Sequence, residues 1–162
     1  MNPASGKVAS LHLHPALSGT PLSAVAHVKA VASKGIVGDQ RYFARISRRT
    51  RQPSRRQVTL IEREVLARHA ATLHRHPFQP GEARANIETE GIDLAATVGH
   101  NLRVGSILLD VIEHREPCAK MDALEPGLRN LMTPPCQGVI ATVIESGEAS
   151  VGDLIIDCGP SS

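Results

Sequence analysis

Short apolar segments separated by glycines run along most of this chain and constrain its fold more than any other feature. Residues 8–13 alternate apolar and polar side chains, as expected of a half-buried strand. In residues 107–112 and 139–144 both faces are apolar, which indicates central strands covered on both sides or the wall of a barrel. Further strand-like segments cover residues 82–88, 102–104, 106–114, 138–144 and 154–157. Many short strands and few helices predict a mainly β fold, a barrel or a sandwich.

Residues 60–71 form the one extended helix that the sequence predicts. Thr59 followed by Glu62 matches a capping box, and Arg68 and His69 suit the negative end of the helix dipole. Residues 57–60 are predicted as a short strand or as the lead-in to this helix. The sequence also predicts a strand at residues 24–31, a turn at residues 35–39, one or two helical turns at residues 128–132, and a mobile loop at residues 45–55, which have no apolar period.

Composition limits the class of protein. The 162 residues are 41% hydrophobic and 21% charged, so we expect a single globular domain spanning residues 1–162. No apolar run is long enough to span a bilayer, and the first residues lack a secretory signal. Three cysteines, none in a CxxC pair, argue against a disulfide framework or structural zinc and favour the reducing cytoplasm.

Arginines are concentrated in one segment. The net charge is +2, so the seven arginines between residues 41 and 56, which include Arg48, Arg49 and Arg56, leave −5 for the rest of the chain. Guanidinium groups bind phosphate with two parallel hydrogen bonds, so this cluster is a candidate anion site. The alternative is a solvated, flexible loop. Nucleic acid is disfavoured as a partner, because the total charge is near neutral and aromatic residues make up only 2%.

Cys118 is the candidate reactive residue. It follows a long apolar strand that Pro117 ends, and nearby cations such as Lys120 stabilise a thiolate, which is the nucleophilic and metal-binding form. Glu116 and Asp122 act in the opposite direction. The alternative is a small buried hydrophobic residue, which describes most free cysteines.

Two other polar pairs have both a structural and a functional interpretation. Arg84 and Asn86 are two residues apart in a predicted strand, so they share one face that projects either into a ligand cleft or into solvent. His12 and His14 form an HxH pair that could chelate a metal on a strand. With no third ligand nearby, we interpret these histidines as structural or solvent-facing.

The order of several motifs resembles the MOSC domain family, named for the C-terminal domain of molybdenum cofactor sulfurase. The resemblance covers residues 8–156 and implies a β-barrel-like fold of mixed strands with a few helices. It also implies binding of the molybdenum cofactor or carriage of sulfur for it. The motifs are Gly35-Ile36-Val37-Gly38-Asp39, Arg56-Gln57-Val58-Thr59-Leu60-Ile61, Arg84-Ala85-Asn86-Ile87, Gly91-Ile92-Asp93-Leu94, Val98-Gly99 through Val104-Gly105, Pro117-Cys118 and Val151-Gly152-Asp153.

The resemblance assigns roles to particular residues. It implies that Cys118 is the essential sulfur carrier or a molybdenum ligand, and that Arg56, Arg84 and Asn86 hold the pterin phosphate. The chain has no counterpart of the sulfurases' pyridoxal-phosphate domain, so that cofactor is not supported. It also lacks the additional N-terminal domain of the amidoxime-reducing relatives, which indicates a stand-alone MOSC domain.

Two alternatives to cofactor or sulfur handling remain open on the sequence. One is a small molybdoenzyme that reduces N-hydroxylated compounds and takes electrons from a partner protein. The other is a non-catalytic module that binds an anion or a protein partner through the arginine loop. A sulfur-donor protein is the expected partner if Cys118 carries sulfur.

Overall fold

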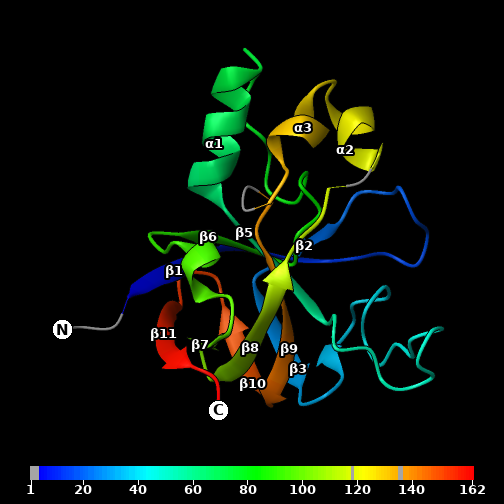
Figure 1. Ribbon diagram of the computed structural model, residues 1–162, viewed down its shortest axis with the longest axis vertical. Coiled ribbons are helices and arrows are strands. Elements are labelled where there is room, and N and C mark those ends of the chain that lie inside the picture. The colour runs from blue at the N-terminus through cyan, green and yellow to red at the C-terminus, as the bar shows by residue number, and fades with distance from the viewer. Residues whose placement is uncertain (1–3, 118, 135–136) are drawn as a thin grey trace.

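Seven strands form a closed mixed barrel in the computed structural model, which describes residues 4–117, 119–134 and 137–162 (Figure 1). Neighbouring strands are antiparallel except for one parallel pair, β5 and β6, and pairing of the first strand with the last closes the ring. In order around the barrel the strands are β1 (Ser5–Leu13), β6 (Ile87–Glu90), β5 (Val58–Glu62), β9 (Val139–Glu145), β8 (Ile107–His114), β7 (His100–Val104) and β11 (Leu154–Pro160).

The remaining elements decorate this barrel. Strand β2 (Ser23–Val25) pairs antiparallel with the end of β1, and a small sheet contains β10 (Gly147–Ser150), β3 (His27–Val31) and β4 (Gly35–Ile36). The helices α1 (Arg63–Thr72), α2 (Ala119–Leu124) and α3 (Leu128–Leu131) lie together at the upper end in Figure 1, and a 3-10 turn spans Leu94–Thr97. The structure confirms the predicted β-barrel class. No helix among the described residues is long and apolar enough to cross a membrane.

Two clusters of buried aliphatic side chains lie on opposite faces of strand β5. Successive side chains of a strand point to opposite faces, so Leu60 on β5 packs inside the barrel, whereas Ile61 packs under the helices. The second cluster joins Ile61 to Leu66 of α1, Met121 of α2 and Leu128 of α3. Strand β5 therefore connects the barrel interior to the end of the molecule that carries the helices.

The predicted helix begins in the wrong place. Residues 60–62 belong to β5, and α1 starts at Arg63 after Glu62, which makes no side-chain capping bond. Thr59 does not cap a helix, because its hydroxyl donates to the Asn86 side chain over 3.2 Å and accepts the Asn86 backbone N–H over 3.0 Å. A contact between residues distant in sequence thus replaces the local capping box.

Several strand boundaries also differ from the prediction. Residues 24–31 divide at Ala26 into β2 and β3, which belong to different sheets. Strand β6 begins only at Ile87, so residues 82–86 are not extended as predicted. A bulge between Val8 and Ser10 interrupts the alternation of β1, and His12, predicted on the polar face, is fully buried. Residues 45–55 form a loop, as predicted, and it contains one isolated bridge between Ile46 and Pro53. The predicted mobility of this loop stays a prediction.

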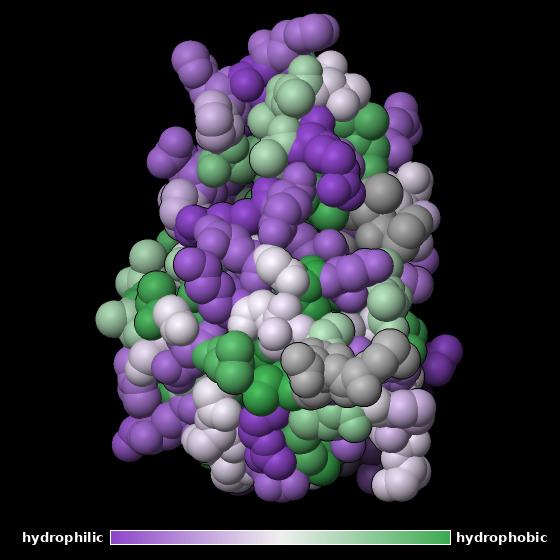
Figure 2. Space-filling model, turned by 90° about the vertical axis from the view of Figure 1, so that its left-hand side faces the viewer, coloured by the Kyte–Doolittle hydropathy of each residue, from purple (hydrophilic) through white to green (hydrophobic). Residues whose placement is uncertain are grey.

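The face formed around α1 and β1 carries paired charges. Figure 2 shows hydrophilic side chains across much of this face, with hydrophobic ones in small separate patches. Lys7 lies 3.5 Å from a carboxylate oxygen of Glu90, and Arg63 lies 3.2 Å from one of Glu88 and 3.6 Å from one of Glu90. Acidic and basic groups on this face therefore neutralise one another.

Candidate functional site

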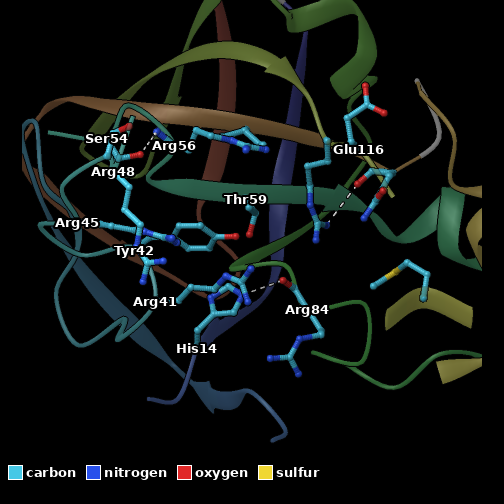
Figure 3. Close-up of a pocket in the computed structure, with 15 residues that line it drawn as sticks. His14, Arg41, Tyr42, Arg45, Arg48, Ser54, Arg56, Thr59, Arg84 and Glu116 are labelled. Atoms are coloured by element: carbon cyan, nitrogen blue, oxygen red, sulfur yellow. Dashed lines mark hydrogen bonds between the residues drawn. The ribbon is translucent and has the colours of Figure 1, made fainter. Parts of the chain in front are cut away.

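A cavity of about 470 Å³ lies beside the loop of residues 41–56 (Figure 3). We call it the arginine cavity. Glu116 contributes the single carboxylate among the described residues of its lining. Because low-dielectric walls focus the field of clustered charges, such a cavity attracts anions. Six arginines line it: Arg41, Arg45, Arg48, Arg56, Arg84 and Arg115.

The two sides of the arginine cavity differ in character. Figure 3 shows Arg45 and Arg48 on one side, with Glu116 on the other. Near Glu116, the guanidinium of Arg115 is buried and donates to the backbone carbonyl of Gln137 over 3.3 Å. The uncharged side chains of Met121, Gln137 and Ile140 also line the cavity. The site therefore combines a cationic side with a less charged, partly apolar one.

Gln137 presents a hydrogen-bonding atom with no partner. Its side chain is buried and lines the arginine cavity, and its Oε1 atom makes no hydrogen bond with the described residues. Buried polar atoms nearly always have a partner, so this oxygen is an open acceptor beside the cavity, which a donor would reach only after the atoms that cover it move. The next residue, Gly138, has φ +86°, and a Cβ there would overlap the carbonyl oxygen of Leu60. Only glycine fits this close approach, which fixes the chain beside Gln137.

A buried carboxylate organises the wall of the cavity. Asp39 Oδ2 accepts hydrogen bonds from the His14 ring over 2.8 Å and from the Asn86 amide over 2.7 Å. Burial acts to raise the pKa of Asp39, but hydrogen bonds from His14 and electrostatic attraction to it outweigh burial and hold that pKa below its ordinary value. Asp39 is therefore an ionised anchor for the surrounding chain.

This anchor positions residues that line the cavity. Asp39 Oδ1 accepts the backbone N–H groups of Arg41 and Tyr42 over 3.1 and 2.9 Å. The Tyr42 ring meets the His14 ring edge to face at 5.1 Å, and the Arg41 guanidinium lies 5.4 Å from the Tyr42 ring centre. His14 Nε2 donates to the backbone carbonyl of Arg84 over 3.0 Å. Hydrogen bonds and ring contacts around Asp39 therefore hold the backbone of Arg41 and Arg84 in place beside the cavity.

Arg84 and Asn86 do not share a strand face as predicted. Arg84 has φ +63°, a left-handed conformation, and its guanidinium donates to the carbonyl of Thr20 over 2.9 Å while lining the cavity. Asn86 is fully buried and does not line the cavity. Its amide instead bridges Asp39 and the strand β5 at Thr59. The predicted contact of Asn86 with a cofactor stays a prediction.

The other predicted site residues are distributed as follows. Arg48 and Arg56 line the arginine cavity with Arg84, so the structure brings these three together. Arg49 is exposed and does not line it. Cys118 and the side chain of Lys120 lie outside the described residues. In the part of the chain that is described, no three His, Cys, Asp or Glu side chains are placed to hold a metal ion.

Sequence reasoning gave no binding role to several residues of the site. His14 was interpreted as structural or solvent-facing, and its burial and hydrogen bonds to Asp39 and Arg84 confirm the structural role, but it also lines the cavity. Asp39 was assigned only to a turn, and Arg115 and Gln137 were given no binding role. The HxH pair and the aspartate that ends the glycine-rich turn are the signals that sequence offers for two of them.

The fold and the cavity define a small mixed β-barrel domain with a cationic site beside its wall. The chain belongs to the MOSC domain family, whose sequence profile matches residues 24–156. No curated protein matches the chain in sequence.

Solved structures share this fold. The crystal structure of APC1665, the YuaD protein of Bacillus subtilis, superposes with a TM-score of 0.79 at 17% identity, over 93% of this chain and 94% of that one. YiiM of Escherichia coli gives 0.68 at 19% identity, over 96% and 71% of the two chains. YiiM of Geobacillus stearothermophilus superposes with a TM-score of 0.69 at 14% identity, over 95% of this chain and 75% of that one.

Proposed function

We propose that the arginine cavity binds the molybdenum cofactor through its phosphate and pterin, and that Cys118 carries sulfur for the cofactor or ligates its metal. The MOSC family is associated with functions of this cofactor. The observation that carries the proposal is the cavity itself, which joins six arginines to a less charged side at Glu116.

The size and charge of the cavity fit such a ligand. Pockets for small molecules enclose about 300–1,000 Å³, and this one has about 470 Å³. Arg48 and Arg56 would bind the phosphate, because guanidinium groups match the geometry of phosphate oxygens. Arg84 is already held in place by Thr20 and His14, so it would lose little side-chain freedom on binding.

The less charged side fits a pterin. A pterin ring presents N–H donors along one edge and apolar faces above and below. The carboxylate of Glu116 is an acceptor for such donors, and a rotation of the Gln137 side chain would bring its unpartnered Oε1 to them. Met121 and Ile140 offer surfaces for the ring faces. Bound there, the cofactor would supply the metal-centred redox chemistry that no side chain of this protein provides.

Cys118 is close in sequence to two residues of the lining. Glu116 precedes it by two positions and Met121 follows it by three, and both line the cavity. This placement supports Cys118 as the residue that meets the cofactor. As a soft thiolate it suits either molybdenum or sulfane sulfur.

Cofactor loading tests this proposal. Purified protein would be mixed anaerobically with molybdenum cofactor released from a donor enzyme, desalted, and assayed for molybdenum and pterin by mass spectrometry. Cys118→Ala is compared with Cys158→Ala, a matched control because Cys158 is exposed on β11. We expect stoichiometric pterin on the wild type and on Cys158→Ala.

The outcome for Cys118→Ala separates the possible roles. Loss of molybdenum with retained pterin identifies Cys118 as the metal ligand, and turnover of N-hydroxylated compounds with a chemical reductant would then extend the function to a reductase. Retained metal with loss of persulfide formation identifies sulfur carriage. Absence of pterin from every variant, with salt-sensitive phosphate binding that ignores Cys118, contradicts the proposal and leaves an anion-binding module.

A further inference from the structure

A second cavity adjoins the arginine cavity. It encloses about 460 Å³ and shares five lining residues with its neighbour: His14, Arg41, Arg45, Arg48 and Arg84. The rest of its lining comes from the segment after β1, at Pro15, Ala16 and Ser18. No carboxylate is among the described residues that line it. The same four arginines therefore line both cavities.

Three of the shared arginines have no carboxylate partner among the described residues. Arg41, Arg45 and Arg48 form no ion pair with any carboxylate in the described ranges, whereas Arg55 on the same loop lies 3.3 Å from Asp110. A single phosphate group carries about −1.5 to −2 charges at pH 7, which is less than three guanidinium groups carry. One phosphate in the arginine cavity would therefore leave positive charge facing the second cavity.

The wall between the cavities is held in place. His14 is buried against Asp39 and donates to the Arg84 carbonyl, and the backbone of Arg41 donates to Asp39. The Arg84 guanidinium donates to the carbonyl of Thr20, in the loop that leads to β2. These bonds tie the arginine loop to the segment after β1, so the two cavities are parts of one preorganised site.

We propose that the second cavity is a subsite for a second phosphoryl group, so that the protein selects ligands that contain a diphosphate. The proposal rests on the proposed function for the occupant of the arginine cavity and deepens it. Applied to the cofactor, it favours the dinucleotide form, in which a diphosphate joins the pterin to a nucleoside, over the form with a single phosphate.

Calorimetric titration with inorganic phosphate and with pyrophosphate tests the subsite. Ala16 is exposed and lines only the second cavity, so Ala16→Glu adds a negative charge there without altering the arginines. Ala16→Gln is the matched neutral control. We expect the wild type and Ala16→Gln to bind pyrophosphate at least about tenfold more tightly than phosphate, and Ala16→Glu to reduce this preference to about twofold.

Each other outcome has a defined meaning. An unchanged preference in Ala16→Glu, whether both affinities fall together or neither falls, overturns the second subsite. Equal affinity of the wild type for the two anions does the same. If neither anion binds, the phosphate site of the proposed function fails as well.

A second arm separates free diphosphate from the cofactor. The protein is equilibrated with the isolated pterin cofactor in its monophosphate and its dinucleotide form, and bound pterin is measured by mass spectrometry after desalting. Greater retention of the dinucleotide form by the wild type, lost in Ala16→Glu, supports the cofactor assignment. Equal retention of the two forms overturns that assignment, although cofactor binding itself would stand.

Discussion

The barrel interior and the arginine cavity adjoin along strands β5 and β9, but their side chains differ in charge and in exposure to solvent. The interior contains aliphatic side chains such as Leu102, Leu109 and Val111, each almost completely buried. The cavity wall contains cations such as Arg45 and Arg48 that are exposed and have no acidic partner among the described residues. We therefore expect stability to come mainly from the first region and the proposed ligand affinity from the second, so that substitutions separate these two effects.

The largest expected effect on folding comes from the interior. Leu102 on β7 is fully buried, and removing most of a buried leucine side chain costs about 3 kcal/mol through lost burial and the cavity left behind. We expect Leu102→Ala to lower the free energy of unfolding by that amount in urea titration, while phosphate affinity of the folded protein is unchanged. A fall in phosphate affinity would show that the two regions are coupled.

Asp39 lies between the two regions and should affect both. Asp39→Asn removes the negative charge and replaces one acceptor oxygen with an NH2 group, so either the donors His14 and Asn86 or the backbone donors of Arg41 and Tyr42 lose their acceptor. We therefore expect a loss of about 2 kcal/mol in unfolding free energy. The pKa of Asp39 is lowered by folding, so its contribution to stability is present above the ordinary carboxyl pKa of about 4 and is lost as pH falls through the lower folded value.

The measurement for Asp39 is unfolding free energy as a function of pH. The difference between wild type and Asp39→Asn should be full at pH 6 and shrink on acidification below about pH 4. A difference that does not vary with pH would contradict the ionised anchor. Phosphate affinity should also fall, because Asp39 holds the backbone of Arg41 and Tyr42.

Glu62 sharpens the comparison, because it is a partly buried carboxyl group that belongs to neither region. Burial, together with repulsion from Asp93 and Glu64, raises the pKa of Glu62 to about 7. Its protonated form is favoured by folding, so the associated stability is complete below about pH 4.5 and is lost as pH rises through 7. The side chain is partly exposed, and after allowance for solvent screening we expect an effect of about 1 kcal/mol.

Glu62→Gln tests this expectation. The variant should be more stable than the wild type by about 1 kcal/mol at pH 8 and equally stable at pH 4 in thermal or urea unfolding. Equal stability at both pH values would show that the carboxylate is well solvated. Phosphate affinity should not change, since Glu62 does not line the arginine cavity.

Arg48 gives the smallest expected effect on folding and a large one on binding. Arg48 is exposed, so Arg48→Gln should change the unfolding free energy by less than about 0.5 kcal/mol. Loss of one charged hydrogen-bonding group should weaken phosphate binding about tenfold. Arg49→Gln is the matched control, because Arg49 is the next residue in the chain and its side chain does not line the cavity. Equal weakening by both variants would indicate a general charge effect instead of a site.

The barrel could be predicted from the sequence because its signals are local. The apolar runs of β8 and β9 and the glycine turns between strands are each encoded within a few residues. The start of α1 was predicted wrongly because a long-range contact decides it. Thr59 has the local pattern of a helix cap, but Asn86, distant in sequence, uses its hydroxyl. Where a tertiary hydrogen bond competes with a local motif, the sequence alone does not decide between them.

The cavity was only partly predictable for the same reason. The arginine run marked one wall, because seven like charges in one segment are visible in the sequence. The other wall brings together His14, Arg84 and Gln137, which come from three separate segments. Arg84 lines the cavity from a left-handed conformation, which an arginine, unlike glycine or asparagine, does not signal in the sequence.

The pairing of β1 with β11 has a consequence for the order of events during synthesis. Ser5 pairs with Ile156 and Lys7 with Leu154, so strands from the two extremes of the described chain complete the ring. A nascent chain holds its first strand with one edge unpaired until residue 156 has left the ribosome, and contacts of such long range form slowly. The aliphatic interior is therefore open to misassociation until β11 is available, and a nascent chain halted before residue 154 should bind a hydrophobic dye that the chain of residues 1–162 excludes.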